Sequence, residues 1–190
     1  MRIIPYIKFL FTSTNAHGVH SPFVFDLVQK VFYADNPLLK GKYSKSEQLL
    51  FRTVHHFNPE LIYINDVELK ELAILQSAAA VTQKIQHKTH LAYLSYKEKA
   101  AIQNKFEQLL PTINNNTILI IKHIHASPDM EKAWIIIKNH HSVTVSIDTY
   151  KWGFVFFRNE QQKEHFVIRT SKSKLTDFIL GIPKLWGMLH

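Results

Sequence analysis

The sequence predicts an α/β sandwich built around a mainly parallel β-sheet. From residue 61 onward, short apolar strands alternate with helical segments, and two adjacent apolar segments over 143–158 are typical of an antiparallel hairpin. The chain has 190 residues, of which 46% are hydrophobic, so it is long enough for one domain with a complete core. We therefore expect a single domain, with an N-terminal helical cap (1–45), a core (46–169) and a basic, apolar C-terminal tail (170–190).

The cap is predicted to be helical from its start signals. Residues 3–13 read as a short amphipathic helix. Ser21 and Pro22 begin a second helix, with serine as the N-cap and proline in the first turn, which continues through FVFDLVQKVF. A third helix, EQLLFRTVHHF, is expected to begin at Ser46 and to end near Asn58.

The core is predicted from alternating strand and helix signals. The run of alanines at 78–80 favours helix, Pro111 closes a helix, and the Ser127-Pro128 pair begins another. We also expect a turn at 151–153. The predicted strands are 61–64, 91–95, 117–121, 143–148, 154–158 and 165–169, and the predicted helices are 67–80, 98–110 and 127–139.

The composition excludes several kinds of site. Without cysteine, the chain has no disulfide, no thiolate nucleophile and no cysteine-based metal centre. No apolar run reaches the length of a membrane span, and the start, MRIIPYIKFLF, is interrupted by Pro5 and Lys8 and lacks a cleavage site. We therefore expect a cytoplasmic protein. The net charge of +8 permits an anionic partner such as nucleic acid or an anionic surface.

Four segments carry a resemblance to a known family: AHGVHSPFVFDLV, FEQLLPTINNNTILII, MEKAWIIIK, and VTVSIDTYKWGFVFFR with EHFVIR. In these segments the chain resembles a bacterial family of class I S-adenosylmethionine (SAM)-dependent methyltransferases that is similar to small-molecule O-methyltransferases. The resemblance implies a Rossmann-like, doubly wound sheet whose last strand is antiparallel. It also implies a SAM site beyond the carboxyl ends of the early strands.

The chain departs from this family at the SAM loop. The family carries an acidic residue at the end of the first strand and glycines in the turn that follows; the matching positions here are Ile64, Asp66 and Lys70. No glycine occurs between Gly41 and Gly153. The segment therefore reads as an ordinary helix start, with its carboxylates stabilised by the helix dipole.

Three further departures concern the rest of the expected site. The carboxylate that binds ribose in the family is absent, and the basic segment QKIQHKTH stands in that region, where lysines disfavour the SAM sulfonium. Only 30 positions separate Leu61 from Leu91, which predicts a shortened sheet. The metal-binding positions of catechol-type relatives correspond to Ser95, Lys122 and His123, and a lysine repels a cation. The chain therefore resembles a shortened, degenerate family member.

Histidines supply the remaining candidates. His17 and His20 lie at the entry to the second helix, and His123 and His125 follow the third core strand, so a family-like cap would bring the pairs together. These four imidazoles are weak candidates for a metal site, because the spacings match no ligand signature. A packing role for them is the alternative. Tyr96 and His123 are the candidate catalytic residues if the chain still transfers a methyl group.

Three functions remain open from the sequence. In the first, the chain has lost SAM binding and catalysis and serves as a binding or partner subunit, with a homodimer among the options. In the second, it is an active SAM-dependent methyltransferase with an unconventional pocket. In the third, its basic surface binds nucleic acid or an anionic surface, and a steep salt dependence would identify this function.

Overall fold

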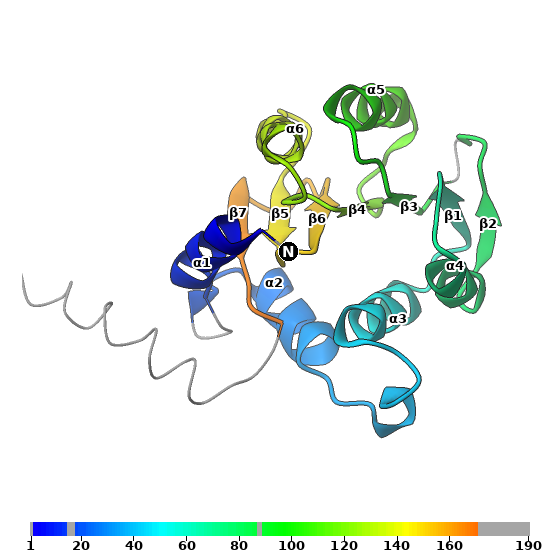
Figure 1. The fold of residues 1–190 in the computed structure, drawn as a ribbon. Coiled ribbons are helices and arrows are strands. Elements are labelled where there is room, and N and C mark those ends of the chain that lie inside the picture. The colour runs from blue at the N-terminus through cyan, green and yellow to red at the C-terminus, as the bar shows by residue number, and fades with distance from the viewer. Residues whose placement is uncertain (1, 15–17, 87–88, 171–190) are drawn as a thin grey trace, which may run out of the picture.

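The computed structural model, which describes residues 2–14, 18–86 and 89–170, has a Rossmann-like α/β fold (Figure 1). Its strands are β1 (Leu61–Ile64), β2 (Ala80–Thr82), β3 (Leu91–Leu94), β4 (Ile118–Lys122), β5 (Val145–Asp148), β6 (Trp152–Phe156) and β7 (Glu164–Val167). They form one sheet in the order β2-β1-β3-β4-β6-β5-β7. The pairings are parallel except those of β6, which runs against β4 and β5 on its two sides. The mainly parallel sheet and the antiparallel hairpin are therefore confirmed.

Helices cover both faces of this sheet. They are α1 (Ile3–Thr12), α2 (Pro22–Leu27) with a π-helical continuation (Val28–Phe32), α3 (Lys45–Phe57), α4 (Leu69–Gln76), α5 (Lys99–Leu109) and α6 (Pro128–Asn139). In Figure 1, α5 and α6 lie over one face, α2, α3 and α4 lie over the other, and α1 lies beside β7. Short 3-10 turns occur at Pro37–Leu39 and Leu110–Thr112.

Two apolar layers fill the space between the helices and the sheet. One joins the sheet to α2, α3 and α4, and the other joins it to α5 and α6. Every residue of β3, β4 and β6 is buried, because both faces of these strands are covered. This explains why they read as continuous apolar runs in the sequence rather than as alternating patterns.

The helix starts agree with the sequence at two of three serines. The hydroxyls of Ser21 and Ser127 accept hydrogen bonds from backbone N–H groups one turn later, and each is followed by proline. The prediction for α3 was wrong, because its N-cap is Ser44 rather than Ser46. The Ser44 hydroxyl accepts from the N–H of Glu47, whose carboxylate accepts from the N–H of Ser44 at 2.7 Å. This reciprocal capping box fixes the helix start.

The prediction of a helix over 67–80 was wrong at both ends. It begins at Leu69 and ends at Gln76, and Ala80–Thr82 form an edge strand that pairs in parallel with β1. Pairing with an open sheet edge outweighs the weak helix preference of alanine. Within the described part of the segment between β1 and β3, only α4 and β2 are regular elements.

The turn predicted at 151–153 was also misplaced, because Gly153 lies inside β6. A Cβ atom on Gly153 would lie 2.5 Å from Cζ3 of Trp134 on α6. Glycine is therefore needed here for close packing of helix on strand, and the turn lies immediately before β6, at Tyr150 and Lys151.

The N-terminal cap is tied to the end of the chain's last strand. The Thr14 N–H donates to the Val167 carbonyl at 2.8 Å, and the Arg169 N–H donates to the Thr14 carbonyl at 3.2 Å. Tyr6 of α1 packs edge-on against Tyr150, with ring centroids 4.9 Å apart. These contacts place α1 beside the edge strand β7 and the turn between β5 and β6. Of the tail predicted over 170–190, all but residue 170 lies outside the described residues.

Candidate functional site at the carboxyl edge of the sheet

The candidate site lies where the carboxyl ends of β1, β3 and β4 meet. The chain leaves β1 toward α4 on one face and leaves β3 toward α5 on the other, which makes this a topological switch point of the sheet (Figure 1). Ligands of open α/β sheets bind at such points. Here a side chain bridges the two strands, because Asn65 Oδ1 accepts a hydrogen bond from the Ser95 N–H at 2.7 Å.

A buried ion cluster occupies the same edge. Lys122, the last residue of β4, places its Nζ 2.8 Å from Glu71 Oε1 and 2.6 Å from Glu68 Oε1 on the first turn of α4. The side chains of Lys122 and Glu71 are only 11% and 6% exposed, whereas that of Glu68 is 72% exposed. Burial lowers the pKa of Lys122, but hydrogen bonds to both glutamates outweigh it and raise the pKa overall. Lys122 is therefore a fixed cation.

The inner side of this cluster is polar and enclosed. Tyr93 of β3 is fully buried, and its pKa is raised by burial and by the Glu71 carboxylate. Its hydroxyl, Glu71 Oε2 and Asn65 Nδ2 are buried without a hydrogen-bond partner among the described residues. The Lys122–Glu71–Tyr93 group therefore fills the interior of the switch point with the protein's own side chains.

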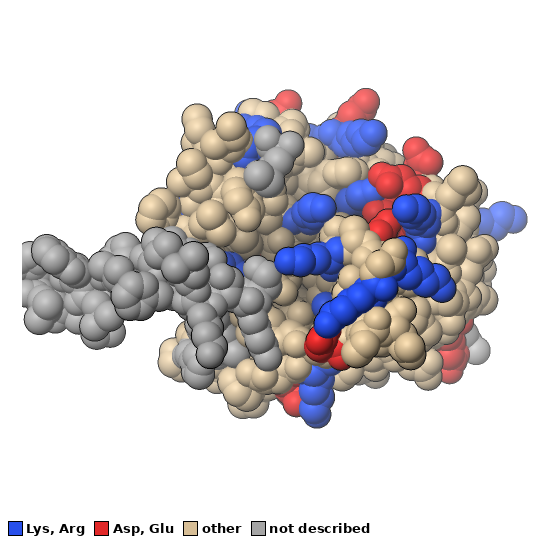
Figure 2. Space-filling view, turned by 60° about the horizontal axis from the view of Figure 1, so that its bottom comes forward, with Lys and Arg blue, Asp and Glu red and all other residues tan. Residues whose placement is uncertain are grey.

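A cavity of about 710 Å³, the carboxyl-edge cavity, opens outside this cluster. Its walls come from the start of α3, the ends of β4 and β5, and the ion cluster, and include Ser44, Glu68, Lys122, His123, Tyr150 and Lys151. Figure 2 shows Lys and Arg side chains gathered around a hollowed face, with Asp and Glu side chains among them. The lining therefore carries both signs of charge: Lys122 pairs with Glu68 and Glu71, whereas Lys151 donates to the Ser46 hydroxyl.

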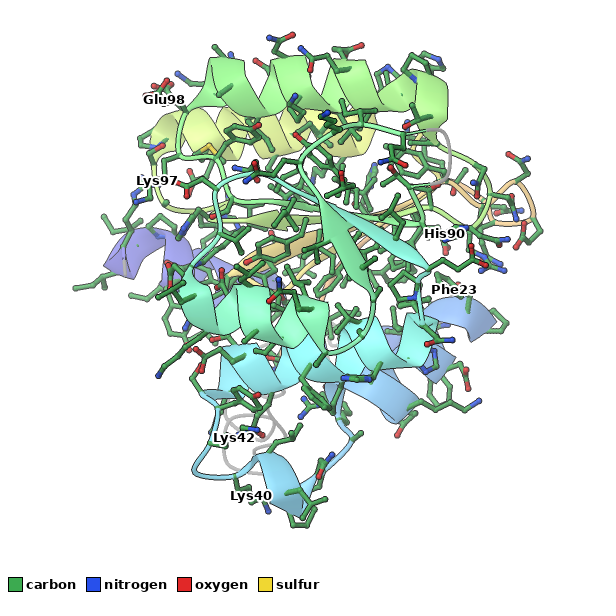
Figure 3. The ribbon with its side chains drawn as sticks, turned by 90° about the vertical axis from the view of Figure 1, so that its right-hand side faces the viewer. Phe23, Lys40, Lys42, His90, Lys97 and Glu98 are labelled. Atoms are coloured by element: carbon green, nitrogen blue, oxygen red, sulfur yellow. The ribbon has the colours of Figure 1, made fainter. Side chains whose placement is uncertain are left out.

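His123 is the one predicted catalytic residue that the structure places in this cavity with accessible ring atoms. Its backbone has a φ of 67°, and its N–H donates to the Lys151 carbonyl at 3.0 Å. Burial lowers the pKa of His123, as do the charges of Lys122 and Lys97. Figure 3 shows Lys97, which follows β3, at the opposite end of that strand from His90. His123 is therefore a neutral imidazole near pH 7.

His125 has a different role, because carboxylates engage both of its ring nitrogens. Nε2 lies 2.7 Å from Asp148 Oδ2, and Nδ1 lies 3.3 Å from Glu131 Oε1. Burial lowers the pKa of His125, but hydrogen bonds to Asp148 and Glu131 outweigh it and raise the pKa. The ring stacks on Tyr150 at 5.1 Å, and Arg2 also pairs with Glu131 at 2.9 Å. This arrangement suits a structural imidazolium.

This arrangement predicts a pH dependence of stability. A group whose pKa is raised by folding stabilises the fold below its unfolded pKa, near 6.5, and loses that contribution as the pH rises through the folded value. His123, His140 and His165 have lowered pKa values and titrate below this range, so urea unfolding from pH 7 to pH 9 is expected to show a declining free energy of unfolding in the wild type. The decline should be smaller in His125→Gln, in which Asp148, Glu131, Arg2 and Tyr150 still face position 125. Equal slopes in the two proteins would contradict the role of His125.

The structure separates the other predicted site residues. Ile64 is buried in the core, and Asp66 and Lys70 are exposed without lining the carboxyl-edge cavity. Tyr96 packs with the apolar layer beneath α5 and α6, on the other side of the sheet from the cavity. Of the two candidate catalytic residues, only His123 lines the carboxyl-edge cavity.

The proposed histidine metal set is also divided. His123 and His125 share the cavity, exposed His20 does not line it, and His17 lies outside the described residues. Over residues 2–14, 18–86 and 89–170, no group of three or more His, Asp or Glu side chains is arranged to hold a metal ion. In the same ranges, no helix has the length and apolar character needed to cross a membrane.

Comparison with known proteins does not identify a family for this chain. The chain matches no protein-family model, no curated protein and no solved structure. Its function is therefore inferred from the residues at the carboxyl edge.

Three residues of the site are not predicted from the sequence: Asn65, Glu71 and Tyr93. Glu71 carries a readable signal, because it lies on the same face of α4 as the buried Ile74 and Leu75. A carboxylate on the buried face of a helix needs a cationic partner. Asn65 carries no comparable signal, because its hydrogen bond depends on how β1 and β3 are paired.

Proposed function

We propose that this chain is a methyltransferase-like protein that does not bind SAM and acts as a non-catalytic binding subunit. The observation that carries the proposal is the Lys122–Glu71–Glu68 ion cluster. It occupies the switch point of the sheet, where a Rossmann-like protein holds its cofactor. The buried Lys122–Glu71 ion pair fills this position with the protein's own side chains.

The described residues do not fit SAM. The turn after β1 has no glycine, so side chains stand where the backbone of a methyltransferase approaches its cofactor. β1 ends at the apolar Ile64, and β2 is followed by Gln83 and Lys84 rather than by a carboxylate that could bind ribose hydroxyls.

The topology supports the methyltransferase part of the proposal. The sequence resemblance implies a doubly wound sheet that ends in an antiparallel strand. The antiparallel strand here is β6, which lies between β4 and β5, whereas β7 follows it and pairs in parallel with β5. The short connection between β1 and β3, with α4 and β2 as its regular elements in the described residues, supports a shortened member.

Calorimetric titration and thermal shift with SAM and S-adenosylhomocysteine test the proposal. We expect no heat of binding and no change in melting temperature at ligand concentrations up to about 1 mM, where a functional site of micromolar affinity is saturated. A SAM-dependent methyltransferase measured in the same buffer is the control for ligand quality.

Micromolar binding of either ligand would overturn the proposal and favour the active methyltransferase. In that case His123, a neutral imidazole in the carboxyl-edge cavity, is the first residue to test as a base. His123→Ala would then lower the rate of methyl transfer while leaving SAM binding in place.

A further inference from the structure

Helix α1 has an apolar face on its solvent side. Ile3, Ile4, Ile7 and Phe11 are 69%, 81%, 46% and 60% exposed, and their spacing places them on one stripe of the helix. The opposite side of α1 is also apolar, since Phe9 is buried and packs against Tyr150. A surface helix normally turns charged residues to the solvent, so this stripe lacks its expected covering.

The stripe continues across a groove onto α6. An apolar groove of about 960 Å³ lies between the two helices, lined by Ile3, Ile4, Pro5, Phe9, Trp134 and Ile135 among others. Ile135 and its neighbour Ile136 are 50% and 47% exposed. We call the six exposed side chains on both sides of the groove the α1–α6 face: Ile3, Ile4, Ile7, Phe11, Ile135 and Ile136.

The free charges beside this face are positive. Lys8 and Lys138 line the groove, and neither has an acidic partner within the described part of the chain. The acidic residues that line the groove are already paired, Glu131 with Arg2 and His125, and Asp148 with His125. The whole chain carries a net charge of +8. The face therefore combines exposed apolar side chains with uncompensated lysines.

We propose that the α1–α6 face docks on the surface of an anionic lipid bilayer. Isoleucine and phenylalanine side chains would enter the boundary between headgroups and acyl chains, while Lys8 and Lys138 contact lipid phosphates. A second copy of the chain on the same face would bring like-charged lysines together without carboxylates to pair them, so the charges favour lipid. This surface lies apart from the ion cluster at the switch point, so the inference stands whether or not SAM binds.

Vesicle co-sedimentation tests the inference. The full chain is mixed with vesicles of pure phosphatidylcholine or of phosphatidylcholine with phosphatidylglycerol, at low and high salt. We expect binding to the anionic vesicles, weakening at high salt. The triple variant Ile3→Ser, Ile4→Ser, Ile7→Ser should partition at least about tenfold more weakly. Lys8→Glu with Lys138→Glu should also weaken binding and should reduce its salt dependence.

A matched control removes exposed apolar surface elsewhere. Leu38 and Leu69 are 86% and 84% exposed and lie off the α1–α6 face, so Leu38→Ser with Leu69→Ser should bind vesicles as the wild type does. Circular dichroism verifies that all variants are folded. Absence of binding to anionic vesicles overturns the inference. So does equal binding by the triple variant, or a wild-type dimer in sedimentation that the triple variant abolishes.

Discussion

Glu71→Leu and Lys122→Met, made singly, are each expected to lower the free energy of unfolding by about 3–5 kcal/mol. The first leaves buried Lys122 with only the exposed Glu68 as its partner, and the second leaves buried Glu71 without a cation. The two side chains are 6% and 11% exposed, and their charged atoms lie 2.8 Å apart. The double variant should recover most of the loss and fall within about 2 kcal/mol of the wild type, since apolar side chains of similar volume avoid the desolvation cost. Urea unfolding at pH 7 measures all three proteins.

Glu68→Gln is the control for this cycle. Glu68 also bonds Lys122, at 2.6 Å, but its side chain is 72% exposed, so its removal should cost less than about 1 kcal/mol. If the single variants at 71 and 122 were as stable as Glu68→Gln, the pair would be open to water. The switch point would then not be filled as described.

Trp152→Ala is expected to destabilise the fold by about 3–5 kcal/mol. Trp152, at the start of β6, is 2% exposed, and its ring packs edge-on against Tyr93 at 6.3 Å. It also forms part of the wall of the carboxyl-edge cavity. Its removal should therefore leave a void and admit water toward the buried Tyr93 hydroxyl. Thermal and urea unfolding measure the loss of stability.

Trp152→Phe separates packing from water entry. It keeps an aromatic ring against Tyr93, so we expect a smaller loss than for alanine, and the melting temperature should lie between those of the wild type and Trp152→Ala. A phenylalanine variant no more stable than the alanine variant would show that the indole ring is needed for more than filling space.

Most of the fold could be predicted from the sequence because its signals are local. Continuous apolar runs mark strands covered on both faces, and serine–proline pairs mark helix starts. β2 could not be predicted, since Ala80–Thr82 become a strand only by pairing with the open edge of β1. The sequence predicts a turn at Gly153, because nothing local indicates that Trp134 packs on this residue.

The site was less predictable than the fold. The absence of glycine after β1 predicts that this segment is not a cofactor loop. It does not predict which side chains occupy the cofactor's place. Lys122 was recognised as an unsuitable metal ligand, whereas its partnership with Glu71, 51 positions earlier in the chain, depends on where α4 lies over the sheet. Such a contact follows from tertiary packing, which a single sequence does not display.

The bridge between Thr14 and Ile168 also bears on how the chain is made. A ribosome adds residue 14 more than 150 residues before residue 168, so α1 emerges long before the strand edge that fixes it exists. Throughout synthesis the apolar side of α1 that later packs on Tyr150 is exposed together with its outer stripe. Nascent chains of this protein therefore expose the apolar helix α1 early, and its inner side is buried only late in synthesis.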